Sequence, residues 1–387
     1  MPLNRFLFTK SIKYGIVIFG DDMESINEIL NNFKFKGELV DCSVYGSGHI
    51  NVTYLAVYNN NGKEDKYIIQ KINPNVFKNI EKLMDNIFDV TSFLRDKIRK
   101  AGGDENRETL HFMKTVAGNK FYCAKDGSYC RAYVFVSDSV CYNSVDNAEL
   151  FKQSGIAFGK FQRLLADFPA DTLYETLPEF HNTKHRFDAE FIPAVSNNLS
   201  GRKNTCQNEI DFVMERKAYC SRLVDLIAEG KLPLRVTHND TKLNNVLFDK
   251  NSNKAICVID LDTVMPGLAL YDFGDSIRFG ANTAVEDEKD LSKVSINLDY
   301  FKAYADGFLS EAGKSLNPCE IENLAFASLL MTFECGMRFL TDYLNGDTYF
   351  KTAYPEHNLV RAKNQFALVA DMEKHMDEME KIISDFE

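Results

Sequence analysis

The sequence predicts an α+β fold in two parts, a small antiparallel β-sheet with a helix followed by a mostly α-helical part. Three observations predict it. Short β-branched segments recur between residues 39 and 136, apolar residues repeat at helical spacing from Asn147 onward, and one hairpin, 246–260, is set into the helical part. We place the boundary after residue 137, which gives domains at 1–137 and 138–387.

Composition limits the class of protein. The chain has 387 residues, enough for two domains, and its formal charge of −11 argues against a nucleic-acid-binding or anionic membrane surface. Its nine cysteines are scattered without a C-x-x-C pair, which favours a reducing cytoplasm over disulfides or zinc sites. No run approaches the roughly 18 apolar residues of a membrane span, so we expect none.

The first part is expected to contain one short helix and several strands. Residues 21–33 place apolar side chains at helical spacing behind an Asp. Strands are expected at 39–45, 51–58, 66–72, 112–115, 120–123 and 129–136, and a second helix at 74–100. Gly46-Ser47-Gly48 separates the first two strands; glycine lets backbone amides approach an anion closely, although such a turn needs no ligand.

The second part is expected to be helical. Helices are predicted at 147–167, 206–229, 287–313, 317–345 and 357–386. Between the second and third of them lies the hairpin, in which the apolar segments 246–249 and 255–259 flank a turn rich in Asn and Ser. No internal repeat or low-complexity tract interrupts this pattern.

Polar side chains surround this hairpin. Asn245 immediately precedes its first strand and Asp260 follows its second, so antiparallel pairing sets both at the same open end. An amide and a carboxylate oxygen meeting there suit a Mg²⁺ ion that bridges nucleotide phosphates. Asp262 is either a second metal ligand or a solvated neighbour, and the sequence leaves the two readings even.

Asp240 completes the spacing H-x-D-x-x-x-x-N with His238 and Asn245. On the loop entering the hairpin, its carboxylate is placed to accept the proton of a substrate hydroxyl that attacks the γ-phosphorus of ATP. Asp and Asn also dominate ordinary turns, and we accept that reading for 249–253. The order of Asp240, Asn245 and Asp260 instead favours a phosphoryl-transfer site.

Two nearby residues are expected to support this loop. His238 should hold it through side-chain hydrogen bonds rather than act in catalysis. Asp272, in the triplet Asp272-Phe-Gly, lies beyond the hairpin and its following Pro-Gly turn, so we interpret it as a brace for the loop and Asp260 as the metal ligand.

The third strand departs from the kinase pattern, which places a lysine there and a partner carboxylate on the next helix. Alternation puts Lys71 on the face of Ile69 and points the usual lysine register at Gln70. Either a neutral amide takes that place or the strand shifts by one. Glu81 is the candidate partner, although a solvated surface glutamate is equally plausible. The backbone of Phe135 and Val136, where the last strand ends, is the candidate for the adenine edge.

These motifs resemble those of the aminoglycoside phosphotransferase and choline kinase group, which has a protein-kinase-like bilobal fold. The resemblance covers about residues 35–370. Longer strings are similar to the N-acetylhexosamine 1-kinases: Tyr45–Asn51, Phe158–Phe168, Phe180–Thr183, Val258–Gly267 and Arg338–Asp347. The resemblance therefore implies ATP and Mg²⁺ as cofactors and a sugar as the acceptor.

The acceptor is expected near two of these strings. Asn182 follows Pro178 in a loop, and Arg338 and Asp342 lie one turn apart on a late predicted helix. A sugar site needs directional hydrogen bonds and an apolar face. A loop cap and an ion pair four residues apart would explain the same residues. The residues alone leave this open; the resemblance assigns Arg338 and Asn182 to the sugar.

The motifs thus predict a cytoplasmic small-molecule kinase that binds a nucleotide and neither nucleic acid nor membrane. The resemblance implies that its acceptor is a sugar, an N-acetylhexosamine phosphorylated at the anomeric hydroxyl. One alternative is another alcohol acceptor such as choline or an aminoglycoside, which the acidic charge favours. The other is a nucleotide-binding pseudokinase. Gln70 supports that reading, whereas Asp240, Asn245 and Asp260 oppose it.

Overall fold

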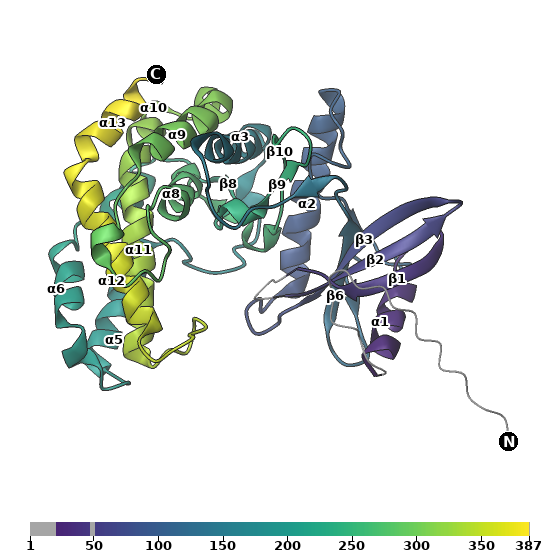
Figure 1. Cartoon of the computed structure of the whole chain (residues 1–387), viewed down its shortest axis with the longest axis horizontal. Helices are drawn as coiled ribbons and strands as arrows, with labels where there is room; N and C mark the ends of the chain where they lie inside the picture. The colour runs from purple at the N-terminus through teal and green to yellow at the C-terminus, as the bar shows by residue number, and fades with distance from the viewer. Residues whose placement is uncertain (1–20, 47–50, 387) are drawn as a thin grey trace. The chain divides into compact units, whose positions relative to one another are not determined.

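The computed structural model describes residues 21–46 and 51–386, which form two compact units. The first unit contains the residues up to Met84 and His111–Ser137, and the second contains Asp85–Leu110 and everything from Asp138 onward. The first is an antiparallel sheet with a helix, and the second is mostly helical (Figure 1). The predicted α+β, protein-kinase-like class is confirmed.

The first unit is built on one six-stranded sheet. Its strands pair antiparallel in the order β1-β2-β3-β6-β4, with β5 also paired to β6. Their bounds are β1 Glu38–Val44, β2 Val52–Asn60, β3 Lys63–Ile72, β4 Phe112–Met113, β5 Tyr122–Cys123 and β6 Tyr129–Val134. Helix α1, Asp21–Asn31, lies beside this sheet (Figure 1). Each expected strand is therefore present, within a few residues of its predicted ends.

One face of this sheet forms the core of the first unit. Tyr67 and Ile69 of β3 pack with Ala132 of β6 against Ile26 and Ile29 of α1. Because side chains alternate along a strand, Lys71 shares this face, and its Nζ lies 3.4 Å from Asp126 Oδ2. The opposite face carries Gln70. Lys71 and Gln70 thus face opposite sides of the sheet, as the alternation of side chains predicted.

Helix α2, Ile80–Lys100, crosses the boundary between the units. Asn86 Nδ2 donates to the carbonyl oxygens of Tyr174 at 2.7 Å and Val264 at 3.0 Å, and Lys97 pairs with Asp167 at 2.6 Å. All of these partners lie in the second unit. Residues 85–110, which we placed in the first domain, therefore group with the second, because contacts distant in sequence hold them there.

The second unit contains two small sheets. The hairpin β9–β10, Val246–Asp249 and Ala255–Val258, forms as predicted and is joined by β7, Ser139–Val140. Strands β8, Arg235–Thr237, and β11, Met265–Gly267, pair antiparallel on either side of it in sequence. The chain thus enters the hairpin from β8 and leaves it into β11, with the polar motif between them.

Helices make up the rest of the second unit (Figure 1). They are α3 Ala148–Leu164, α4 Thr183–His185, α5 Ile192–Asn197, α6 Gln207–Glu215, α7 Tyr219–Ala228, α8 Ala269–Gly280, α9 Leu298–Ala312, α10 Pro318–Glu322, α11 Leu324–Asn345, α12 His357–Lys374 and α13 Met376–Ser384. The predicted helix at 287–313 is shorter than expected, and those at 206–229, 317–345 and 357–386 are each divided in two. Helix α8 was not predicted.

Helix α11 is long and apolar enough to span a membrane, by length and composition only. Its most apolar window has a mean hydropathy of 1.3, and 89% of that window is buried inside the structure. It packs against α8 and α12. At Gly274 of α8 an added Cβ would lie 2.5 Å from the Ala327 carbonyl oxygen of α11. These features describe the core helix of the second unit.

Helices α3 and α9 approach each other closely at glycines. A Cβ added to Gly155 would lie 2.5 Å from the Tyr304 carbonyl oxygen, and one added to Gly307 would lie 2.2 Å from the Lys152 carbonyl oxygen. At these distances an added Cβ would clash with a backbone carbonyl oxygen of the facing helix, and backbone cannot move aside as a flexible side chain does. The two helices can pack at this distance only without side chains at the crossing.

We predict that Gly155→Ala destabilises the protein by about 1–3 kcal/mol, because the new methyl group forces α3 and α9 apart. The matched control is Gly313→Ala, where the nearest atom to an added Cβ is 3.9 Å away. That change should be neutral or slightly stabilising. Thermal unfolding of both variants tests this, and equal unfolding midpoints would contradict the close approach.

Candidate active site

The hairpin brings Asn245 and Asp260 to one end, as its pairing predicted. Val246 pairs with Val258, and the Ile259 amide donates to the Asn245 carbonyl oxygen at 2.9 Å, so the ladder continues to the last residue before Asp260. Asp260 adopts a left-handed backbone, with φ 61°, and opens a short 3₁₀ turn, Leu261–Thr263. Asp is among the few residues that tolerate this conformation, which is often found at functional sites.

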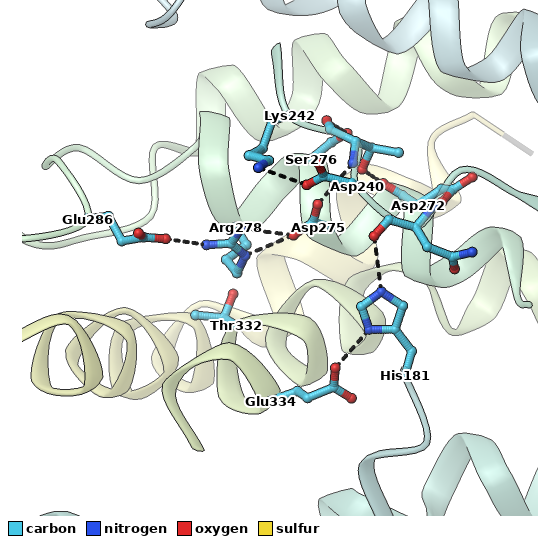
Figure 2. Close-up of polar contacts among 12 residues, drawn as sticks. His181, Asp240, Lys242, Asp272, Asp275, Ser276, Arg278, Glu286, Thr332 and Glu334 are labelled. Carbon is cyan, nitrogen blue, oxygen red and sulfur yellow. Dashed lines mark hydrogen bonds and ion pairs between the residues drawn. The ribbon is translucent and has the colours of Figure 1, made fainter. Parts of the chain in front are cut away.

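Both carboxylate oxygens of Asp240 are engaged by neighbours on the loop. Lys242 Nζ lies 2.9 Å from Asp240 Oδ1 (Figure 2). Asn245 Nδ2 donates to Asp240 Oδ2 at 3.1 Å. Asn245 Nδ2 also donates to the Asp240 carbonyl oxygen at 2.8 Å. The Asp240 side chain is 30% exposed, so a substrate can reach it. The loop thus presents an oriented, accessible carboxylate.

The oxygen ligands at the hairpin end fit a hard cation. The amide nitrogen of Asn245 is turned toward Asp240, so its oxygen is the atom that remains for a metal, and Asp260 is exposed. Asp262 is buried at 4% exposure, so the reading of it as a solvated neighbour is wrong. Mg²⁺ commonly takes one or two protein oxygens and completes its shell with phosphates and water. Within 21–46 and 51–386, no group of three or more His, Cys, Asp or Glu is arranged to hold a metal.

Asp272, in the first turn of α8, braces His238–Thr241, the segment that we call the catalytic loop after its predicted function. Its Oδ2 accepts the His238 amide at 2.9 Å, and its Oδ1 accepts the Asn239 amide at 2.8 Å. Gln162 Nε2 of α3 donates to Oδ2 at 2.7 Å. Burial raises the pKa of Asp272, while His238, the two amides and Gln162 oppose that rise. This geometry agrees with the supporting function expected for Asp272.

His238 joins the loop to the end of β10. The Asp240 amide lies 3.3 Å from His238 Nδ1, and His238 Nε2 lies 2.9 Å from the Ile259 carbonyl oxygen. Because an amide donates to Nδ1, the proton of the neutral ring sits on Nε2 and bonds to that carbonyl. The ring is fully buried, so it holds the two segments together and is not accessible to substrate.

A second carboxylate of α8, Asp275, was missed by the sequence analysis. Its Oδ2 accepts the Thr241 amide at 3.0 Å, and its Oδ1 accepts from Arg278 Nε at 2.9 Å. Arg278 also pairs with Glu286 at 2.9 Å (Figure 2). Burial alone would raise the pKa of Asp275, but Arg278, Lys242 and His181 hold it below the usual value. The sequence did offer one signal for Asp275: it lies three residues after Asp272, which puts both carboxylates on the same face of a helix.

The loop that contains Phe180 contacts the catalytic loop through His181. His181 Nε2 lies 3.3 Å from the Asn239 carbonyl oxygen, and Nδ1 lies 2.7 Å from Glu334 Oε1 of α11 (Figure 2). Thr183 Oγ1 donates to the other Glu334 oxygen. Burial alone would raise the pKa of Glu334, but His181, Arg186 and Arg338 hold it below the usual value. This loop is thereby fixed against the residue before Asp240.

The predicted acceptor residues lie in different settings. Asn182 is half-buried; its Oδ1 caps helix α4 by accepting the His185 amide at 3.0 Å, and its Nδ2 donates to Glu179 at 2.7 Å. Arg338 contacts the rings of Phe180, Tyr349 and Phe350 at 4.9, 5.9 and 5.7 Å. Across the part of the chain that the structure describes, no hydrogen bond joins its guanidinium to another residue.

Asp342 has a structural function. Its carboxylate accepts the amides of Thr348, Tyr349 and Phe350 at 2.8, 2.8 and 2.9 Å and the side-chain amide of Asn358 at 2.8 Å. With 4% exposure and every oxygen engaged, it fixes the loop after α11. The expected contact of Asp342 with an acceptor therefore has no support in the structure.

Several nucleotide-binding candidates lie in the first unit. Gly46 has a left-handed backbone, with φ 76°, whereas Ser47 and Gly48 lie outside the described residues. Gln70 Nε2 donates to Thr53 Oγ1 at 3.1 Å, and its Oε1 accepts from Arg131 Nε at 2.9 Å. These bonds tie Gln70 to both neighbouring strands.

The remaining candidates of that unit lie at its helix and at the end of β6. Glu81 is exposed on the first turn of α2. The Phe135 amide donates to the Lys66 carbonyl oxygen at 3.0 Å, and Val136 is buried. Their functions, and the choice between Gln70 and Lys71, stay predictions.

The fold and this loop define a class of protein. The model of the phosphotransferase enzyme family matches residues 41–307, more than half of the chain, so the chain belongs to that family. Solved structures with the same fold include a spectinomycin phosphotransferase in complex with ADP and spectinomycin, at 14% identity and a TM-score of 0.55, covering 92% of this chain and 98% of that one.

Two further structures share the fold. Choline kinase from Cryptosporidium parvum Iowa II is 13% identical, with a TM-score of 0.55 over 92% of this chain and 97% of that one. A GDP complex of an aminoglycoside 2'-phosphotransferase mutant is 11% identical, with a TM-score of 0.54 over 88% and 94%. The chain is therefore a phosphotransferase with the fold of the aminoglycoside phosphotransferases and choline kinases.

We predict that Asp272→Asn destabilises the protein by about 1–3 kcal/mol, because the new NH₂ group cannot accept one of the two loop amides and leaves it buried and unpaired. Asp377→Asn, the same change at an exposed position of α13, is the matched control and should change little. Thermal unfolding measures both. An unfolding midpoint for Asp272→Asn as high as that of the control would show that this carboxylate does not brace the loop.

Proposed function

We propose that this protein is a cytoplasmic, ATP- and Mg²⁺-dependent kinase that transfers the γ-phosphate to the anomeric hydroxyl of an N-acetylhexosamine, giving a sugar 1-phosphate. Family membership supports phosphoryl transfer, and the site residues support a neutral, hydroxyl-bearing acceptor. All nine cysteines are free thiols, which suits a reducing cytoplasm.

The observation that carries the choice of acceptor is the pair of guanidiniums around Phe180. Arg338 lies 4.9 Å and Arg186 5.5 Å from the centre of this half-buried ring. Burial and the positive charge of Arg338 lower the pKa of Arg186, whereas Glu334 and Glu190 act to raise it, so the two cations repel each other in spite of these carboxylates. A cationic acceptor such as choline or an aminoglycoside would add to that repulsion, whereas carbonyl and hydroxyl oxygens of a sugar accept from guanidinium.

The same loop would also direct the sugar hydroxyl toward the carboxylate of Asp240. Phe180 is half-buried, so part of its apolar ring is open to contact with a pyranose. The next residue, His181, contacts the carbonyl of Asn239, the residue before Asp240. A sugar held on the Phe180 loop is thus held by a segment fixed to the catalytic loop. Positioning of this kind supplies much of the catalysis in phosphoryl transfer.

In the proposed reaction Asp240 accepts the proton of the anomeric hydroxyl while the hydroxyl oxygen bonds to the γ-phosphorus. The bond from that phosphorus to the bridging oxygen breaks, and ADP leaves with the bridging oxygen. Asn245 and Asp260 would hold Mg²⁺, which neutralises phosphate charge. Asn245 Nδ2 keeps the carboxylate of Asp240 oriented, and the brace from α8 keeps the loop in place.

We predict that the purified protein consumes ATP when N-acetylglucosamine or N-acetylgalactosamine is present, and much more slowly with choline or kanamycin. The variant Asp240→Asn tests the base. It keeps the shape of the side chain but removes the proton acceptor, so turnover should fall by a factor on the order of 10² or more. A coupled assay for ADP measures both, and titration with Mg-ATP checks that the variant still binds nucleotide.

The outcomes separate the candidate functions. Turnover only with choline or kanamycin would overturn the sugar assignment and keep the kinase assignment. Nucleotide binding without turnover on any acceptor would point to a pseudokinase. A near-normal rate for Asp240→Asn would exclude this carboxylate as the base.

A further inference from the structure

Three polar side chains form a row across one face of the sheet in the first unit. Thr53 of β2 lies directly opposite Gln70 of β3, and Gln70 lies opposite Arg131 of β6, so the three side chains share a face (Figure 1). Gln70 Nε2 donates to Thr53 Oγ1 at 3.1 Å, and Arg131 Nε donates to Gln70 Oε1 at 2.9 Å. The row therefore runs from a guanidinium through a carboxamide to a hydroxyl.

Arg131 determines the orientation of the Gln70 carboxamide. A guanidinium donates hydrogen bonds and cannot accept them, so the atom that faces Arg131 Nε is the amide oxygen. The NH₂ group of Gln70 is thereby turned toward Thr53. Its bond to Thr53 uses one of its two N–H donors, and the other can donate to a ligand. Because Thr53 Oγ1 accepts this bond, the hydroxyl hydrogen of Thr53 can be donated as well.

The charge of the row is buried, and its neutral donors are accessible. Arg131 is 1% exposed, with its guanidinium 5.6 Å from the centre of the Phe112 ring, whereas Gln70 and Thr53 are partly exposed. A hydrogen bond from a buried cation polarises the amide that accepts it, because the dielectric constant in the interior is low. The surface thus presents N–H and O–H donors with a positive charge behind them, which suits an anion.

The position of the row indicates which anion. The Tyr45 amide donates to the Thr53 carbonyl oxygen at 2.8 Å, and Gly46 follows with its left-handed backbone, so the row lies beside the start of the glycine turn expected from the sequence. Kinases carry a lysine on the third strand that binds the α- and β-phosphates. Gln70 has the register expected of that lysine, and the cation beside it is on the neighbouring strand.

We propose that Arg131 is a positioning residue for the nucleotide, because it holds the Gln70 carboxamide with its NH₂ group directed to an α- or β-phosphate oxygen of ATP. This inference rests on the proposed kinase function. Gln70 and Thr53 contact the phosphate, and Arg131 acts through Gln70. A lysine on the third strand needs no such support, because its ammonium donates in every orientation. The positive charge of the site has therefore moved from β3 to β6.

The first test changes the donor and keeps the partner of Arg131. Gln70→Glu still accepts from Arg131, but a carboxylate replaces the NH₂ group. Calorimetry with MgADP should show an affinity lower by about tenfold or more, while the unfolding midpoint does not fall. The matched control is Asn61→Asp, which makes the same kind of change at the exposed turn between β2 and β3 and should bind MgADP as the wild type does. Equal affinities of the two variants would overturn the proposal.

The second test moves the charge back to the third strand. Arg131→Met leaves the amide free to turn, so the affinity for MgADP should fall about tenfold. Gln70→Lys alone places two cations side by side and should also bind weakly. The double variant should recover most of the affinity, because its lysine brings charge and donors together without support.

A structural function alone for Arg131 predicts a different pattern. Arg131→Met and the double variant would then both have lower unfolding midpoints, and the lysine would restore no affinity, which would overturn the proposal. Should Arg131→Met fail to fold, Gln70→Glu decides, because it retains the arginine and an acceptor for it.

Failure of the proposed function gives a different result from failure of this inference. Calorimetry with MgADP needs no acceptor, so an error in the sugar assignment leaves the test intact. If the wild type does not bind MgADP, the kinase function itself fails. If the wild type binds MgADP and every variant matches it, only the function of Arg131 and Gln70 is overturned.

Discussion

The catalytic loop between β8 and β9 depends on a buried carboxylate that lies more than thirty residues further along the chain. Consecutive amides at His238 and Asn239 both donate to Asp272. The Asp240 amide donates to the His238 ring, and the Thr241 amide donates to Asp275. Buried amides without acceptors would cost about 1–3 kcal/mol each. These bonds replace the β-ladder that the loop lacks, and they leave the side chain of Asp240 facing outward with its oxygens held by Lys242 and Asn245.

The same arrangement explains why α8 carries so many charges in the interior. Asp275 and Arg278 of α8 form a buried ion pair. Arg278 also pairs with the partly exposed Glu286, and Lys242 lies near Asp275 beside the proposed base. On the other side of the catalytic loop, Glu334 of α11 holds His181 and Thr183, which fix the Phe180 loop. Because buried charges need partners, these ion pairs and hydrogen bonds hold α8, α11, the catalytic loop and the Phe180 loop together. The proposed transfer uses this fixed geometry.

Local pattern was enough to predict several parts of this site. Alternation in 246–259 predicted the hairpin, and with it the shared end of Asn245 and Asp260; alternation in 66–72 predicted that Lys71 and Gln70 face opposite ways. Helix α8 was missed because nearly all of its residues are buried, so it lacks the one-sided apolar pattern of a surface helix. Other contacts join residues that only the tertiary fold brings together, and the spacing of residues along the sequence does not show them. They include the hydrogen bonds of Gln70 to Thr53 and Arg131, and those of Asp342 to the loop at 348–350.

The central claim is that Asp240 deprotonates the anomeric hydroxyl of a sugar held by the Phe180 loop and Arg338. Phosphorus NMR of the product formed from ATP and N-acetylglucosamine tests it most directly. The account predicts a phosphorus signal coupled to the anomeric proton, in a non-reducing product that mild acid hydrolyses. A reducing sugar phosphate, with phosphorus coupled to the protons at carbon 6, would contradict it.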